Sequence, residues 1–146
     1  MKYATGRLKA VHVLKFEDRD DLLAEMESFI RAKKIKTAFL VFLGALRKGS
    51  IVSGPKKPVI PPLPNWRKFD GAWEVFGTGS VFQGKGGKPQ LHLHASFGSG
   101  DRVKTGCIRK KAGVFIVVEA AVFELSGIKA GKKTDPVTGI NSLFFY

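Results

Sequence analysis

Residues 90–109 read QLHLHASFGSGDRVKTGCIR and contain two of the three histidines and the single cysteine of the chain. Apolar and polar residues alternate strictly from Leu91 to Phe97, a pattern typical of a half-buried β-strand. On such a strand His92 and His94 share one face. Neighbouring positions on one face lie about 6.5–7 Å apart between Cα atoms, which allows two imidazoles to converge on one ion or one substrate. The stretch therefore predicts a strand that carries a candidate binding site.

Runs of β-forming residues lie on both sides of this stretch. They predict strands over residues 8–14, 36–46, 49–53, 71–82 and 114–125, with Gly44 interrupting the second. Gly84 to Gly87 predicts a hairpin turn, and the proline-rich residues 55–64 predict a loop. Residues 142–146 are expected to form an edge strand or an apolar tail that another chain covers.

One helix is predicted over residues 21–34, where Leu22, Met26 and Ile30 recur at helical spacing. Asp18 or Asp20 is the expected N-cap residue. One helix beside many strands predicts an α+β fold, a curved and mainly antiparallel sheet with one principal helix packed on it. The length of 146 residues favours a single domain over residues 1–146.

The chain is strongly basic, with 25 Lys and Arg against 12 Asp and Glu and a formal charge of +13. An excess of this size attracts polyanions, so DNA is a natural partner class. Because phosphate contacts do not read bases, little sequence specificity is expected. The candidate nucleic-acid-binding residues flank the proline-rich loop and lie near Trp66 and Phe69: Arg47, Lys48, Lys56, Lys57, Arg67 and Lys68.

The single cysteine cannot form an intramolecular disulfide, which suits a reducing compartment. The first residues lack the apolar stretch of a signal peptide, and no apolar run is long enough to span a bilayer. We therefore expect a cytoplasmic protein without membrane association.

An ordered set of motifs resembles the plant and prokaryote conserved (PPC) domain family, whose stand-alone prokaryotic members are known as predicted DNA-binding proteins. Pro89 to His94 matches the family signature Pro-x-x-His-x-His, and Gly106 to Arg109 matches a Gly-Cys-Ile-Arg variant. The other matching segments are Leu14–Leu22, Leu43–Leu46, and Trp73-Glu74-Val75 followed by Gly77 and Gly79. Together these segments cover nearly the whole chain.

The resemblance implies a homotrimer of compact α+β subunits with the histidine motif near subunit contacts. Where many members carry Gly-Gly-His, this chain has Thr105-Gly106-Cys107, so Cys107 replaces a third imidazole. Two imidazoles and a thiolate suit a divalent ion such as zinc and leave one position for water or substrate. Glu74 or Glu119 is a candidate fourth ligand or a partner that orients an imidazole.

Two classes of function therefore remain open. The first is a homotrimeric PPC-like protein that binds DNA or another polyanion. The second is a metal-dependent small-molecule binder or enzyme that uses His92, His94 and Cys107. Two further alternatives are a polar strand face that is hydrogen-bonded at a subunit interface beside a buried inert thiol, and a nucleophilic Cys107 activated by a neighbouring histidine.

Overall fold

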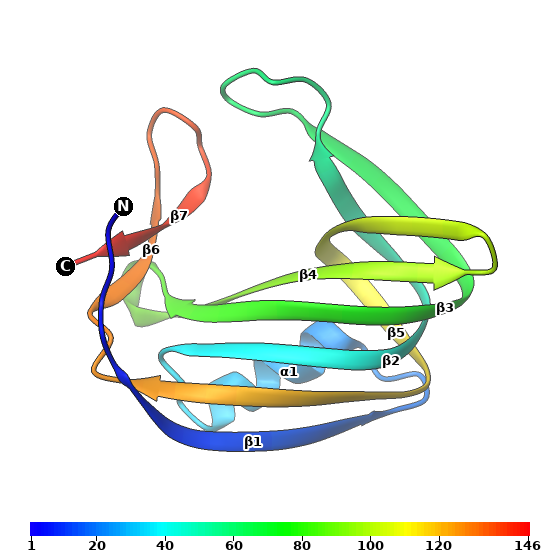
Figure 1. The fold of residues 1–146 in the computed structure, drawn as a ribbon, viewed down its shortest axis with the longest axis horizontal. Coiled ribbons are helices and arrows are strands. Elements are labelled where there is room, and N and C mark those ends of the chain that lie inside the picture. The colour runs from blue at the N-terminus through cyan, green and yellow to red at the C-terminus, as the bar shows by residue number, and fades with distance from the viewer.

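A computed structural model describes residues 1–146 as one long, bent antiparallel sheet with a helix on one side and a small hairpin at one end (Figure 1). The five strands of the main sheet run in the order β1-β5-β2-β3-β4, and β4 also pairs with β5. The two strands of the hairpin, β6 and β7, form a separate sheet. The elements are β1 (Arg7–Glu17), α1 (Leu22–Ala32), β2 (Ala38–Pro55), β3 (Pro64–Gln83), a 3₁₀ turn (Lys85–Gly87), β4 (Pro89–Ser99), β5 (Arg102–Ser126), β6 (Ala130–Thr134) and β7 (Asn141–Phe145).

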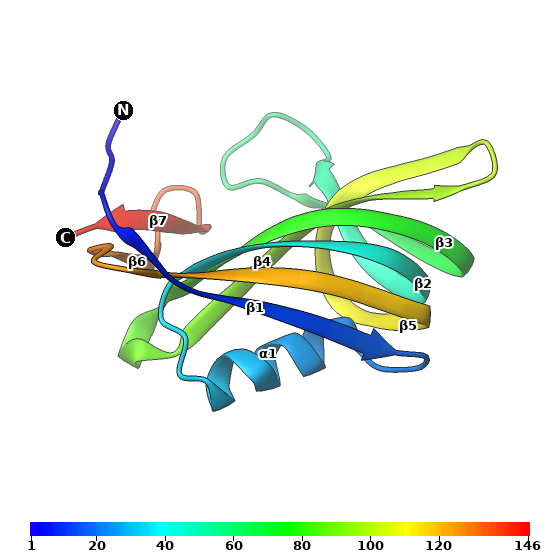
Figure 2. The same ribbon diagram turned by 60° about the horizontal axis from the view of Figure 1, so that its bottom comes forward.

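The helix covers one face of the sheet (Figure 2). Leu22, Met26 and Ile30 are buried and belong to the 23-residue hydrophobic core, together with Leu40 and Phe42 of β2. This arrangement confirms the predicted α+β fold with one principal helix. None of the helices is long and apolar enough to cross a membrane.

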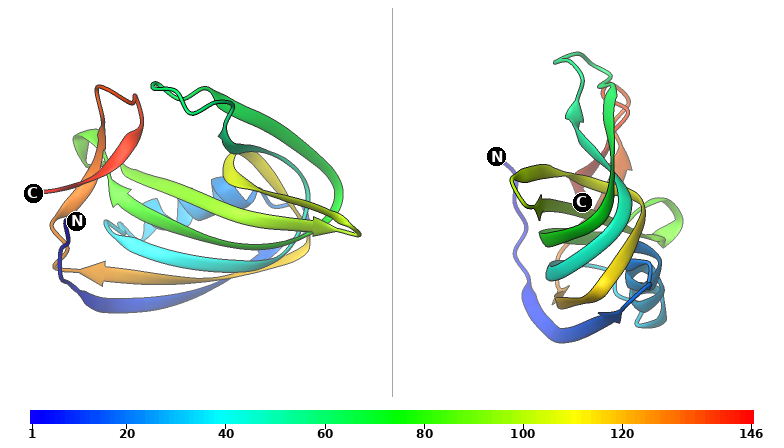
Figure 3. Two further views of the ribbon diagram at one scale, coloured as in Figure 1. Left: turned by 45° about the horizontal axis from the view of Figure 1, so that its top comes forward. Right: turned by 90° about the vertical axis from the view of Figure 1, so that its right-hand side faces the viewer.

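Strand β5 reaches β4 because its pairing with β2 is irregular. Its second half pairs with β1 and with the start of β2, whereas its first half lies between β4 and the end of β2. Three register shifts separate the two halves along β2, and Ile116 of β5 has a left-handed backbone with φ of 64°. Such bulges bend a strand. The bend, which Figure 3 shows from two sides, carries the first half of β5 to β4. There Cys107 pairs with His94.

Several predicted boundaries were wrong. Gly44 does not interrupt β2, because its backbone adopts φ of 137° at a bulge where a Cβ atom would collide with the backbone of β5. Strand β5 begins at Arg102, since the turn after β4 needs only Gly100 and Asp101. The helix cap is Asp21, whose carboxylate accepts hydrogen bonds from the amides of the first turn, in place of Asp18 or Asp20.

Candidate metal centre

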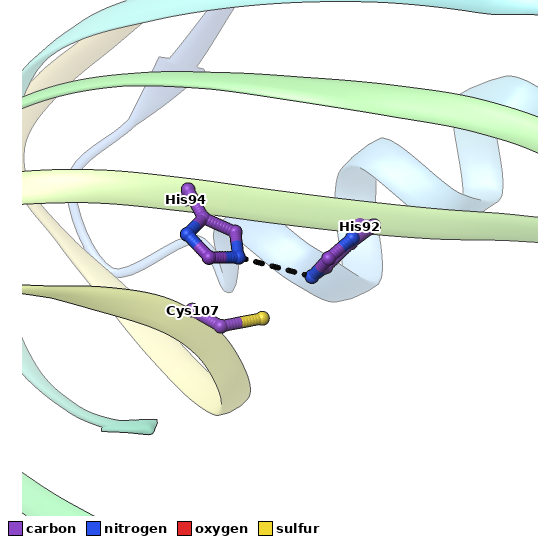
Figure 4. Close-up of side chains that lie close together, drawn as sticks. All are labelled: His92, His94 and Cys107. Carbon is purple, nitrogen blue, oxygen red and sulfur yellow. Dashed lines mark hydrogen bonds between the residues drawn. The ribbon is translucent and has the colours of Figure 1, made fainter. Parts of the chain in front are cut away.

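His92, His94 and Cys107 form the only group of three or more histidine, cysteine or acidic side chains arranged closely enough to hold a metal ion. Their ligand atoms all lie within 4.8 Å of one another. The two imidazoles approach through their Nε2 atoms, which are 3.1 Å apart, and the thiol lies beside them (Figure 4). The three side chains thus converge on one point.

Pairing between β4 and β5 produces this convergence. His94 lies directly opposite Cys107 in the register, so both side chains project from the same face of the sheet. His92 shares that face because it is two residues away on β4. The alternation in the sequence therefore explains why the two histidines lie on one face. The pairing of β4 with β5 explains why Cys107 lies beside them.

The environment keeps both imidazoles neutral near pH 7. Burial lowers the pKa of His92 to about 4, with smaller contributions from His94 in its protonated form and from the charges of Lys132 and Arg109. Partial burial, and then the charge of Arg109, lower the pKa of His94 as well. A neutral imidazole is the form that binds a metal ion, so no proton competes for these two nitrogens at neutral pH.

Cys107 is a poor nucleophile in this environment. Its side chain is buried, with 3% of its surface exposed, and burial raises the pKa of the thiol although the nearby charge of Arg109 opposes the change. The thiol is therefore protonated near neutral pH, whereas the reactive form is the thiolate. The raised pKa thus disfavours the nucleophilic alternative, and the position of the sulfur beside the two imidazoles is the observation that points to a ligand role.

A cleft of about 290 Å³ opens over the three side chains. Its floor includes His92, His94 and Cys107, and its walls come from the two ends of the β2–β3 loop and from Ile140 in the β6–β7 hairpin. The loop and the hairpin both rise above β4 on the same side of the sheet (Figure 1). The proline-rich segment, predicted as a loop, therefore forms part of the site.

Sequence reasoning missed two cations beside the cluster, Arg109 and Lys132. Arg109 lines the same cleft as the three candidate ligands, and its place two residues after Cys107 on one strand was a usable signal. Lys132 lies on β6 and lines an adjoining cleft with His92. No sequence pattern connects Lys132 to the histidines, because only the folding of the hairpin brings it there.

The two glutamates proposed as additional ligands are not part of the cluster. Glu74 lies opposite Gly98, four residues along β4 from His94, and is exposed. Glu119 lies opposite Leu43 and Lys15 in the second half of β5. The group of converging donor atoms therefore contains two nitrogens and one sulfur and no carboxylate.

Five of the six candidate nucleic-acid-binding residues are exposed at the end of β2, in the β2–β3 loop and at the start of β3. Lys68 and Arg67 lie opposite Ser50 and Ile51, and Lys48 lies opposite Asp70, so no two of these basic residues face each other directly in the register. Arg47 differs, because its guanidinium contacts the Asp18 carboxylate and donates to the carbonyl of Val114 at 3.0 Å. Its charge is therefore already paired.

Solved structures of similar shape come from several prokaryotes. A metal-containing protein from Archaeoglobus fulgidus has a TM-score of 0.86 and 25% sequence identity, with 99% of each chain covered. A plant- and prokaryote-conserved (PPC) protein from Pyrococcus horikoshii has a TM-score of 0.84 and 21% identity, covering 100% of this chain and 99% of that one. A candidate DNA-binding protein from Bacteroides thetaiotaomicron has a TM-score of 0.79 and 17% identity, covering 96% of this chain and 97% of that one.

The sequence itself also identifies the family. No curated protein matches the chain. The model of the Plants and Prokaryotes Conserved (PCC) domain, the family also abbreviated PPC, matches residues 3–126. This match covers most of the chain and includes both strands that carry the candidate ligands. The chain therefore belongs to the Plants and Prokaryotes Conserved domain family.

Proposed function

We propose that this protein binds a divalent metal ion of the zinc class through His92, His94 and Cys107, and that a small molecule binds beside the ion in the cleft above. The observation that carries the proposal is the convergence of three donor atoms within 4.8 Å. The description of the Archaeoglobus fulgidus relative as metal-containing supports it.

The donor set fits zinc in its chemistry, and the two imidazoles fit it in their spacing. Zinc in proteins prefers imidazole nitrogen and thiolate sulfur, and three protein ligands are typical of its catalytic sites. Two nitrogens bound to one tetrahedral zinc at about 2.0–2.1 Å are about 3.3 Å apart, close to the 3.1 Å between the two Nε2 atoms. When bound, such an ion polarises an oxygen atom of its ligand as a Lewis acid.

The chain's own residues prepare the site for this role. The neutral imidazoles need not lose a proton, whereas the thiol of Cys107 must lose one when a metal binds. The positive charge of Arg109 beside the sulfur favours that loss. Cys107 is buried, whereas His94 is exposed to the cleft, so the site is open to a ligand from one side.

Elemental analysis of untagged protein, purified without chelator, tests the metal site. We expect about one zinc per chain, and we expect His92→Ala, His94→Ala and Cys107→Ser to lose it. His12→Gln is the matched control, because His12 lies on β1 near Phe29 and Glu124 and belongs to no cluster of candidate ligands.

A second readout identifies the sulfur ligand. Protein loaded with cobalt(II) should show a thiolate-to-cobalt charge-transfer band that Cys107→Ser abolishes. Wild-type protein that binds neither zinc nor cobalt would refute the metal site.

We also infer that the protein is a homotrimer. The face of the sheet opposite α1 exposes apolar side chains that adjoin one another in the register: Val11, Val13, Phe39, Val41, Leu43 and Phe76. Val13 and Phe76 are 83% and 65% exposed. An apolar surface of this kind indicates an interface. Native mass measurement should give three chains, and a monomer at micromolar concentration would refute the assembly.

A second candidate function is binding of DNA with little sequence specificity. Residues 47–68 and 102–113 carry eleven Lys and Arg residues and no Asp or Glu, and the strands that hold them are neighbours in the sheet. The name of the Bacteroides thetaiotaomicron relative also supports this candidate.

The single free cysteine suits the reducing cytoplasm, where we propose that the protein acts.

Titration of duplex DNA at several salt concentrations tests this second candidate. Affinity should fall steeply with salt, and the paired change Lys56→Gln and Lys57→Gln should flatten the salt slope by about one unit for each phosphate that is no longer neutralised. The matched control is Lys33→Gln with Lys34→Gln, which removes equal charge at the end of α1. Absence of binding at low salt would exclude DNA as a partner.

A further inference from the structure

A second cleft adjoins the metal cleft. It has a volume of about 210 Å³ and is lined by Gln90, Leu91, His92, Arg109, Lys132, Gly139 and Asn141. His92 and Arg109 line both clefts, so the two spaces meet at these side chains. The β6–β7 hairpin closes the outer side, because it supplies Lys132, Gly139 and Asn141. A ligand in one cleft therefore lies beside any ligand in the other.

The positive charges at this junction have no acidic partner. Neither Arg109 nor Lys132 takes part in any ion pair of the protein. No aspartate or glutamate lines either cleft. Burial lowers the pKa of Lys132, and its ammonium lies 6.0 Å from the centre of the Phe82 ring. The partly buried Lys132 and the exposed Arg109 thus share one cleft that holds no compensating negative charge.

We propose that Arg109 and Lys132 bind the carboxylate or phosphate group of a small molecule that extends toward the metal cluster. The proposal rests on the metal-dependent function above. It adds that the small molecule bound beside the metal ion is an anion. Arginine presents a planar fork of donors that matches carboxylate and phosphate oxygens, and lysine adds a point charge. The side-chain amides of Gln90 and Asn141 offer further donors.

The fold explains why the two cations meet. Arg109 follows Cys107 by two residues on β5, so it projects from the face that carries the cluster. Lys132 is held by the pairing of β6 with β7, in which it lies opposite Leu143. Because the cleft is small and is lined by the turn end of the hairpin, it suits a small anion and not a nucleic-acid duplex.

Isothermal titration calorimetry at constant ionic strength tests the inference on zinc-loaded, desalted protein. Inorganic phosphate and lactate are the two probes, and the tighter one distinguishes a phosphate from a carboxylate ligand. We expect saturable binding that Arg109→Gln and Lys132→Gln each weaken about tenfold or more, because each removes a charge-assisted hydrogen bond. Arg102→Gln and Lys129→Gln are matched controls that should bind as wild type, since neither residue lines the two clefts.

Zinc content measured on every variant separates the possible failures. If wild-type protein holds zinc but binds neither probe, or if the two cleft variants bind like the controls, the anion site is refuted while the metal site stands. If wild-type protein holds no zinc but binds an anion in a manner that depends on Arg109 and Lys132, the metal site is refuted and the anion site is supported.

Discussion

The two faces of the main sheet have similar sequences but different surroundings. In β2, Leu40 and Phe42 point toward α1 and are 0% and 1% exposed. Val41 and Leu43 alternate with them on the other face and are 41% and 54% exposed. The helix covers only one side, so half of an apolar strand remains uncovered within a single chain (Figure 2).

An exposed apolar face of this kind is typical of a surface that contacts other molecules. A strand that is apolar on both faces is typical of a sheet buried on both sides. In this chain α1 supplies one cover, and we propose that other copies of the chain supply the second. The same face continues across the register from Val41 through Thr78 to His94, so the candidate metal ligands lie at the edge of the proposed interface.

The largest expected effect is loss of assembly when a charge enters the open face. Phe76→Lys should convert the three-chain species to a folded monomer, because an unpaired charge in an apolar interface costs several kcal/mol. Ser28→Lys adds the same charge on the exposed side of α1 and should leave the mass unchanged. Native mass and light scattering measure both, and an unchanged mass for Phe76→Lys would place the interface elsewhere.

A substitution on the covered face should change the stability of the folded chain and not its assembly. Phe42→Ala removes a ring from the 23-residue core and should lower the free energy of unfolding by about 3–5 kcal/mol. The loss should be the same at different protein concentrations, whereas the loss caused by Phe76→Ala should vary with concentration, as expected for an interface residue. Urea unfolding at two concentrations makes the comparison. Equal behaviour of the two variants would contradict the distinction between the faces.

A smaller effect is expected at Gly77, where β3 passes close to the core and to β4. A Cβ atom at this position would meet the ring of Phe42 and would lie 2.7 Å from the carbonyl oxygen of His94. Gly77→Ala should therefore cost about 1–3 kcal/mol through overpacking. Gly98→Ala, at a position with no atom within 4 Å of the new methyl group, should cost much less. Thermal unfolding measures the difference, and an equal shift of the melting temperature in both variants would contradict this explanation.

The smallest expected effect is the pH dependence of the free energy of unfolding of the metal-free protein. The pKa of His92 is lowered from 6.5 to about 4 in the folded chain. Between these values the unfolded chain binds a proton that the folded chain does not, so the free energy of unfolding should decrease as pH falls through this window. Urea midpoints at pH 7 and pH 5 measure the decrease. His92→Ala should show a weaker dependence, and an identical one would assign the titration to another group.

The alternation of residues 91–97 was enough to predict a strand with His92 and His94 on one face, because side chains on a strand alternate between its faces. The spacing of Leu22, Met26 and Ile30 was enough for the helix and its buried side. The apolar run of β2 indicated burial on both faces, whereas within one chain Val41 and Leu43 are exposed and only the face toward α1 is buried. These features depend on local periodicity, which the sequence contains directly.

The rest depended on contacts between segments that are distant in the sequence. The register of the β4–β5 hairpin placed Cys107 opposite His94, and the bulges of β5 allowed one strand to border both β1 and β4. Lys132 reached His92 only through the β6–β7 hairpin, and Glu74 and Glu119 were left outside the cluster by the pairing of their strands. Sequence alone determined which side chains share a strand face. Tertiary structure decided which faces and cations meet, because strand register and bulge position depend on packing across the whole sheet.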